Sequence, residues 1–338
     1  RRSSAAVSAR AAPPAGRALL LACLAAVAAG GAPRAADDEG AWGLVIENDV
    51  FSDTDRHYTN GIRLGRILPR NVTPDWLRDT SDRTGLFPAG ADYRTVISVG
   101  QNMYTPRDIT LDPPDPADRP YAGWLYATAG ISGRSERELN SLELSLGVVG
   151  PASLAGPTQD WFHQLIGSDD PQGWEYQLEN EPALMATYQR RWNMTPRPVG
   201  PFEVTLSPHG GFALGNVFTY ANFGASLLFG DDIADQFGPP RIQPSVPGAG
   251  LVEASDRGWY LYASIEARAV AQNIFLDGNT FRDSAKVEKL PLVGDLQVGA
   301  VASFRGFQLA YNHVFRSDEF EGQRDNASFG AFSVLVAF

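Results

Sequence analysis

The chain closes on the alternating run Ala331-Phe332-Ser333-Val334-Leu335-Val336-Ala337-Phe338. In an extended strand successive side chains point to opposite faces, so the phenylalanines and valines of this run share one face. The smaller residues and the leucine fall on the other face. This period of two predicts a β-strand, rather than a helix, for the end of the chain.

The same alternation recurs from Trp42 onward and divides the chain into strand-sized segments. Phe307 and Leu309, for example, alternate with Gln308 and Ala310. The 34 glycines and 24 prolines supply breaks between such segments. About twelve strands are expected, near 41–51, 57–68, 92–101, 119–133, 140–150, 183–193, 201–213, 216–228, 257–270, 293–304, 305–316 and 327–338.

Soluble β-sandwiches show the same alternation, so three further features decide the class of protein. The N-terminus resembles an export signal, yet no stretch reaches the roughly 20 apolar residues of a membrane helix. The segments are close to the roughly 9–11 residues of a tilted membrane strand. The terminal Phe338 resembles the ending of bacterial outer-membrane barrels. The sequence therefore predicts an all-β fold, a closed antiparallel transmembrane β-barrel of about 12 strands in a bacterial outer membrane.

Residues 1–36 predict a signal peptide, and residues 37–338 a single barrel domain. Arginines precede an apolar run at 18–29, and small residues follow it. The one cysteine, Cys23, lies in this run, so we expect no disulfide, thiolate metal site or cysteine nucleophile in the mature chain. The formal charge of −11 becomes −16 without the five arginines of residues 1–36, which argues against nucleic acid as a partner.

Residues 154–166 break the alternation. Trp161 and Leu165, like Phe162 and Ile166, are spaced four apart as on one side of a helix. We therefore expect a short helix in the connection between the fifth and sixth strands. With both termini in the periplasm, this connection is an extracellular loop. The connections near 69–91 and 229–256 then lie on the periplasmic side, where turns are usually short, so we expect extra strands or helices within them.

Three polar clusters fall in the connections that this orientation brings to the extracellular rim. Convergence of polar residues at one rim predicts a functional site, although the loops of barrels are commonly polar. The clusters are Glu47-Asn48-Asp49 with Tyr58-Thr59-Asn60-Gly61, residues 101–108 with 118–124, and Gln159, His163, Asp169, Asp170 and Trp174.

Gln159 and His163 are one turn apart on the expected helix and share one of its faces. An imidazole in such a position can act as a general base on water. Carboxylates surround His163 in the sequence and in the inferred topology, which distinguishes it from His57, His209 and His313. A serine nucleophile is the other possibility, although the chain has no GxSxG motif.

The acidic and neutral oxygens of the same clusters are candidates for a metal site. Asp49 and Asp169 are hard oxygen ligands, and Asn48 and Thr59 add neutral oxygens. Calcium takes about 6 to 8 oxygens and accepts irregular geometry, so waters or substrate oxygens would complete its shell. Zinc is a poorer match, because only one histidine is placed for it.

An ordered set of motifs resembles the outer-membrane lipid A 3′-O-deacylase family, known as LpxR. The resemblance spans nearly the whole mature chain. The motifs are Glu47-Asn48-Asp49, Tyr58-Thr59-Asn60-Gly61, Gln101 with Tyr104-Thr105-Pro106, and Gly147-Val148-Val149-Gly150-Pro151 with Gln159, His163, Gly167 and Trp174.

The resemblance implies a twelve-stranded barrel with an extracellular active site. It also implies calcium-dependent hydrolysis of the 3′-linked acyloxyacyl ester of lipid A. By position, His163 corresponds to the catalytic base that activates water, and Gln159 to the glutamine one turn before it. Asp49 corresponds to a calcium-binding aspartate, Asn48 to its active-site neighbour and Thr59 to the active-site threonine.

The chain departs from the family pattern at two places. The glutamate that follows the family's histidine by six residues is replaced by an aspartate here, and an active-site lysine falls near Leu111. The candidates for the acidic calcium ligand are Asp169, Asp170 and Glu175. The candidates for substrate contacts, including a lipid A phosphate, are Arg107, Arg119 and Tyr104.

The partners expected on this reading are lipopolysaccharide as the substrate, outer-membrane lipids, and the barrel-assembly machinery, with the protein itself a monomer. Two alternatives stay open. One is a phospholipase-type outer-membrane hydrolase with a serine nucleophile. The other is a barrel without enzymatic activity, such as a passive pore.

Overall fold

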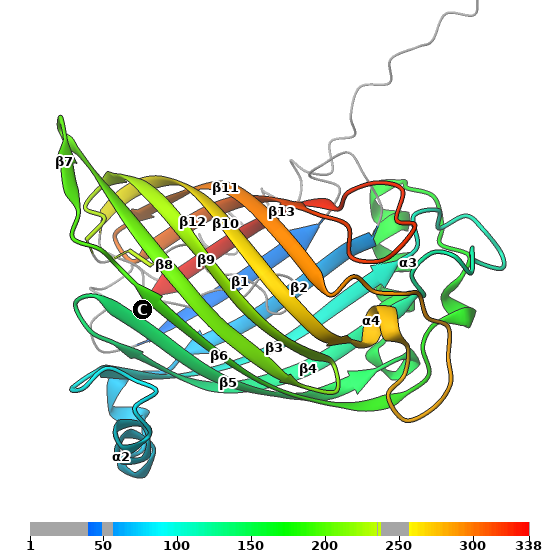
Figure 1. Ribbon diagram of the computed structural model, residues 1–338, viewed down its shortest axis with the longest axis horizontal. Coiled ribbons are helices and arrows are strands. Elements are labelled where there is room, and N and C mark those ends of the chain that lie inside the picture. Colours follow the sequence, from blue (N-terminus) through cyan, green and yellow to red (C-terminus); the bar gives the residue numbers. More distant parts are fainter. Residues whose placement is uncertain (1–39, 49–56, 235, 238–256, 338) are drawn as a thin grey trace, which may run out of the picture.

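The computed structural model describes residues 40–48, 57–234, 236–237 and 257–337, with the side chains of residues 57–59 and 166 excepted. The signal peptide predicted at residues 1–36 lies outside this part of the chain. One antiparallel sheet dominates the described residues (Figure 1).

Twelve long strands form a closed ring. Each strand pairs with its neighbours in the chain, β1 pairs with β13, and β6 pairs with β8 to complete the circle. The predicted twelve-stranded barrel is confirmed, and a three-residue strand, β7, extends one hairpin beside β8. The strands are β1 (Ala41–Asn48), β2 (His57–Ile67), β3 (Asp92–Thr105), β4 (Ala122–Arg134), β5 (Glu138–Val149), β6 (Glu181–Trp192), β7 (Arg197–Val199), β8 (Phe202–Gly215), β9 (Phe218–Asp231), β10 (Arg257–Asn273), β11 (Leu292–Phe304), β12 (Phe307–Arg316) and β13 (Ser328–Ala337).

Alternation along the strands separates an apolar outer face from a polar interior. On β10, for example, Leu261 and Ile265 are exposed, whereas Ser264 and Glu266 are buried. Large apolar side chains are exposed in the same way on the other long strands except β13. An apolar band on the outside of a closed barrel is the arrangement that lipid requires.

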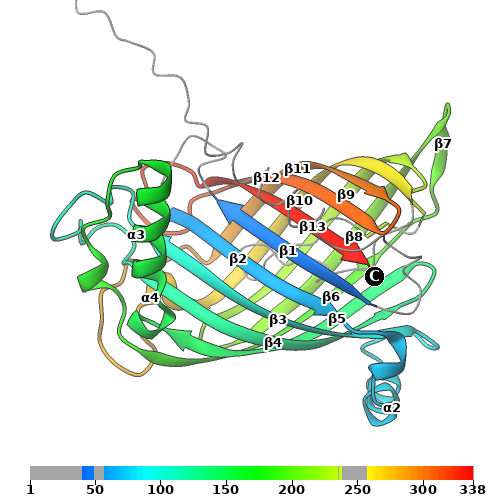
Figure 2. The ribbon, with the colours of Figure 1, turned by 180° about the vertical axis from the view of Figure 1, so that it is seen from behind.

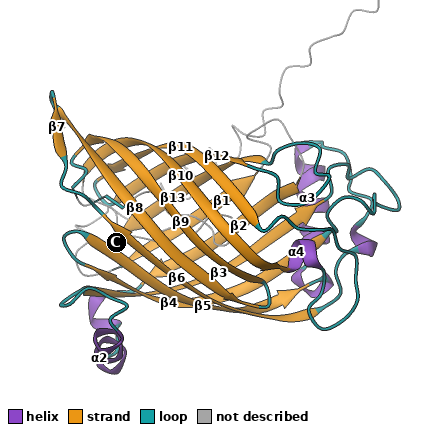
Figure 3. Cartoon of the chain, viewed as in Figure 1, coloured by secondary structure: helices purple, strands orange, loops and turns teal. Residues whose placement is uncertain are grey.

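The two ends of the barrel carry different connections (Figures 1 and 3). One end has the helices α3 (Ala155–Ile166) and α4 (Ile274–Asp277), and the short 3-10 turns η3 (Pro151–Ser153) and η4 (Trp174–Tyr176). The other end has η2 (Arg70–Val72), α2 (Asp75–Thr84) and the C-terminus. Within the described residues, no helix has the length and apolar character needed to cross a bilayer.

Two expectations about the connections can be compared with this arrangement. The helix expected at 154–166 is confirmed as α3. The long connection at 69–91 contains α2, which ends at Gly85 in the left-handed conformation, so an extra helix explains its length. In the second long connection β9 continues to Asp231, and residues 238–256 lie outside the described part.

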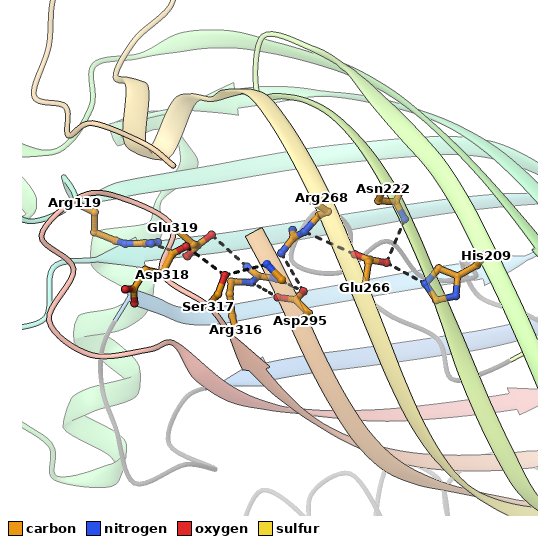
Figure 4. A network of polar contacts seen from close by, with 11 residues as sticks. Arg119, His209, Asn222, Glu266, Arg268, Asp295, Arg316, Ser317, Asp318 and Glu319 are labelled. Atoms are coloured by element: carbon orange, nitrogen blue, oxygen red, sulfur yellow. Dashed lines mark hydrogen bonds and ion pairs between the residues drawn. The ribbon is translucent and has the colours of Figure 1, made fainter. Parts of the chain in front are cut away.

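Ion pairs and hydrogen bonds cross the interior (Figure 4). Three arginines and three carboxylates alternate along this chain of contacts, so their charges balance, and a buried histidine ends it. Buried charges need such pairing. We refer to these residues as the lumenal network: Arg119, Glu319, Arg316, Asp295, Arg268, Glu266 and His209.

Candidate functional site

The segment that leads into α3 packs against the outside of the barrel wall. On β3, Ile97 and Val99 are exposed on the outer face, and continued alternation places Gln101 on the same face. Gln101 is nevertheless buried, and its Nε2 donates to the backbone oxygen of Ser153 at 2.6 Å. The loop that carries α3 therefore covers the outer face of β3 here.

A row of outward-facing positions crosses four strands beneath the same loop. Strand register aligns Asn48 of β1, Asn60 of β2, Met103 of β3 and Gly123 of β4. A Cβ atom on Gly123 would collide with the Cβ of Ala155, the first residue of α3. Glycine at this position thus allows the helix to start directly on the barrel wall.

Helix α3 contacts β3 and β4 and lies across the strand ends (Figure 2). Ala155, Gln159 and His163 are spaced four apart and form its buried face. The helix rises about 12 Å between Ala155 and His163. This is close to the roughly 14 Å that three strand spacings cover between β4 and β1. The helix is therefore long enough to carry His163 from Gly123 toward the end of β1, where Asn48 lies.

A directional chain of hydrogen bonds orients His163, which is only 3% exposed. Trp174 Nε1–H donates to Gln159 Oε1 at 2.7 Å, which turns the Gln159 amide nitrogen toward His163 Nε2, 3.4 Å away. On the other side of the ring, His163 Nδ1 lies 2.5 Å from the backbone oxygen of Asp169. Because a carbonyl oxygen only accepts, Nδ1 carries the proton and Nε2 of the neutral ring presents its lone pair.

Trp174 is held in place by close packing. Its ring lies 5.1 Å from that of Tyr121, and Gly156 of α3 faces it so closely that a Cβ would lie 3.1 Å from the indole. Gly173, just before it, packs against the Tyr121 ring in the same way. In the sequence, Trp174 belongs to the family motif but has no expected role. The Gly173-Trp174 pair that follows the helix is the sequence feature that could have pointed to it.

Acidic side chains lie beside this helix. Burial and the charge of Asp170 raise the pKa of Asp160, while His163 partly opposes the shift. Asp169, Asp170 and Glu175 are all exposed, and the contact between Asp169 and His163 uses the backbone oxygen of Asp169. Within the described residues, no three or more His, Cys, Asp or Glu side chains are grouped as metal ligands. Of these three exposed acids, Asp170 is the one whose charge raises the pKa of a residue of α3, Asp160.

The remaining candidate ligands belong to β1, β2 and the segment between them. Asn48 ends β1 and is 6% exposed, although alternation with Trp42 points it outward. Thr59 lies at a β-bulge, where the register between β2 and β3 shifts, and bulges are common beside active sites. The Thr59 side chain and the whole of Asp49 lie outside the described residues. The oxygen-only donor set suits calcium chemically.

The candidate substrate contacts have different surroundings. Tyr104 is buried on the inner face of β3, where its ring stacks on Phe275 at 3.8 Å. Arg119 is 1% exposed, and its Nη2 lies 2.7 Å from Glu319 Oε2. Arg107 has a partly exposed side chain, and its Nη1 lies 3.5 Å from an exposed carboxylate of Asp325. Among the three, Arg107 is the most accessible side chain.

The fold is similar to that of solved outer-membrane barrels. LpxR from Salmonella typhimurium has a TM-score of 0.71 at 19% sequence identity, covering 88% of this chain and 100% of that chain. The beta domain of the Bordetella autotransporter BrkA has a TM-score of 0.43 at 9% identity, covering 88% of this chain and 99% of that chain. The first likeness describes the fold alone, and the second is too weak to support an argument. A comparison with curated protein sequences found no match.

A family model described as "Outer membrane protein LpxR" matches residues 18–338. The match includes every described strand as well as α3, with Gln159 and His163. It agrees with the closed barrel and its apolar outer face, and it confirms the resemblance inferred from the ordered motifs. The chain belongs to the LpxR family of outer-membrane proteins.

Proposed function

We propose that the protein is a lipid A deacylase that hydrolyses the 3′-linked acyloxyacyl ester at the outer leaflet of the outer membrane. The observation that carries the proposal is the oriented, buried His163 on the face of α3 that meets the outer wall of the barrel. A site outside the wall is next to lipid, so a lipid ester can reach it without entering the barrel.

His163 has the protonation pattern of a general base. Its Nδ1 proton is held by the Asp169 carbonyl, which leaves Nε2 to accept a proton. The 3.4 Å contact from Gln159 to Nε2 is longer than an ordinary N–H···N or N–H···O hydrogen bond. In the proposed mechanism this lone pair accepts the proton of the attacking water.

The proposed reaction needs no covalent enzyme intermediate. Nε2 of His163 accepts a proton from water as the oxygen forms a bond to the ester carbonyl carbon. The tetrahedral adduct then collapses, the bond to the alcohol oxygen breaks, and His163 returns the proton to that oxygen. The products are the released acyloxy fatty acid and the 3′-hydroxyl group of lipid A. Gln159 and Trp174 keep the ring in position throughout.

Calcium is part of the proposal. The residues that would hold it are Asn48, Asp49, Thr59 and an acid of the segment after α3, either Asp169 or Asp170. When bound, such an ion supplies positive charge near the reacting carbonyl, where the negative charge develops. The partly exposed Arg107 would contact a lipid A phosphate.

The interior of the barrel favours an enzyme over a passive pore. Fully buried large side chains, among them Trp124, Arg63 and Phe329, occupy it. The lumenal network crosses it as well (Figure 4). The described interior is filled by packed side chains and paired charges. The candidate for chemistry is therefore the oriented His163 outside the barrel wall.

Mass spectrometry of lipid A from cells that express the protein tests the reaction. We expect loss of the mass of one acyloxyacyl chain with the wild type and with Gln164→Ala, and intact lipid A with His163→Ala. Gln164 is a matched control, because it is an exposed residue next to His163 on the same helix. Unchanged lipid A in cells with folded wild-type barrel would exclude the deacylase.

A serine-directed fluorophosphonate probe separates this mechanism from that of a serine hydrolase. The water mechanism predicts no labelling of the active protein and no inhibition. Labelling that depends on His163 would instead indicate a serine nucleophile.

A further inference from the structure

The outward side of α3 is apolar, although its inward side is polar. Trp161 and Leu165 are 64% and 65% exposed, and Leu154 at the N-cap is 58% exposed. Pro157 is exposed between them. These four residues are spaced three, four and four apart and therefore form a single stripe along the helix. We call them the outer stripe.

The outer stripe is opposite the face that carries the candidate base. Trp161 and His163 are two residues apart, which is about 200° around a helix. A helix on the surface of a soluble protein turns its apolar side inward. Here Gln159 and His163 are buried against the wall, and the apolar side faces away from the protein.

The outer stripe is continuous with the lipid-facing surface of the barrel. Gly123, on which α3 begins, lies one outward position from Leu125 along β4. Two residues of a strand span roughly 7 Å, which is less than the diameter of a helix. Leu125 is aligned through β3 with Ile62 of β2, and both side chains are exposed on the outer face. The helix therefore sits at the border of the apolar band.

We infer that the outer stripe is embedded in the acyl-chain region of the surrounding bilayer, so that membrane lipid covers α3 from outside. The occupant is bulk lipid hydrocarbon, because the stripe extends a surface that lipid already covers in an outer-membrane barrel. A tryptophan among these residues suits the border between hydrocarbon and headgroups. The inference depends on the barrel and its membrane, and it holds whatever reaction the site performs.

Spin labelling tests the inference directly. Leu165→Cys is labelled with a nitroxide in a Cys23→Ser background, and the barrel is reconstituted in phosphatidylcholine vesicles. Power saturation then compares access of oxygen, which concentrates in hydrocarbon, with access of a water-soluble nickel chelate. Leu146→Cys on the outer face of β5 is the lipid control, and Ala117→Cys in the exposed β3–β4 connection is the water control.

We expect the oxygen-to-nickel ratio at residue 165 to match that at residue 146 and to exceed that at residue 117 several-fold. A ratio equal to that at residue 117 would overturn the inference. Exclusion of both reagents would also overturn it, because protein would then cover the stripe. Spin–spin broadening that disappears on dilution with unlabelled protein would identify a second copy as that cover. Trp161→Cys provides an independent second site if the first variant fails to fold.

Discussion

Replacement of Glu319 by glutamine tests how the lumenal network supports the rim of the barrel. Glu319 Oε2 lies 2.7 Å from Arg119 Nη2, and Glu319 Oε1 lies 3.4 Å from Arg316 Nη1. Both arginines are almost fully buried. The variant keeps the shape of the side chain but removes the negative charge, so two guanidinium groups lose a carboxylate that they share.

The expected loss follows from the electrostatics of the site. Burial alone would raise the pKa of Glu319, but Arg119 and Arg316 override it and lower the pKa from 4.5 to about 2. This lowering corresponds to about 3–4 kcal/mol, because each pKa unit is worth about 1.4 kcal/mol. Breaking a buried ion pair by removing one partner typically costs about 3–5 kcal/mol, so the two figures agree.

The assay is urea unfolding of the reconstituted barrel, followed by tryptophan fluorescence. We expect Glu319→Gln to lower the free energy of unfolding by about 3 kcal/mol at pH 7. Glu321→Gln, an exposed position in the same loop, should change it by less than about 0.5 kcal/mol. Equal effects of the two variants would refute the reasoning.

The pH dependence gives a second check on the same pair. Since the folded-state pKa of Glu319 is lowered, its contribution to stability is fully present above the unfolded-state pKa near 4.5. It is lost as the pH falls from there toward about 2. The difference between the wild type and Glu319→Gln should therefore shrink across this window. A difference that stays constant down to pH 2 would show that the carboxylate charge is not its source.

Three further predictions concern the candidate site. Trp174→Phe keeps the ring but removes the N–H donor to Gln159, so kcat should fall roughly 3- to 10-fold with little change in KM, and the kcat–pH profile should shift. Gly123→Val should displace α3 and reduce deacylation of lipid A while the barrel still folds, whereas the exposed Ala127→Val on the same strand should be neutral. A chelator should abolish activity, and added calcium, but not zinc, should restore it.

The strands were predictable because barrel strands obey a local rule. A period of two along the chain defines both the strand and its two faces, and the terminal run ending at Phe338 shows it as clearly as β10 does. The observed strands differ from the expected ones where a strand continues beyond the residues that alternate between apolar and polar. The strand expected to end near residue 101 continues through Asn102 to Thr105, with polar side chains that other segments bury.

The contacts that orient the site were not predictable, because they join residues far apart in the sequence. Arg119 and Glu319 are separated by 200 residues, and only the closure of the ring brings them together. The contact between Trp174 and Gln159 depends on the path of the turns after α3. Local periodicity contains no information about either pair.

The periodicity of α3 predicted the helix but not which of its sides is buried. The spacing of Trp161 and Leu165 predicts the helix correctly. A surface helix of a soluble protein would, however, bury these two apolar residues and expose Gln159 and His163. The reverse arrangement is stable only if the polar face finds hydrogen-bond partners within the protein and the apolar face finds a non-aqueous medium. The polar partners are present in Trp174 and the Asp169 carbonyl. The same helix therefore holds a candidate base against the protein and turns apolar side chains toward the lipid, which places proposed catalyst and proposed substrate on the same side of the barrel wall.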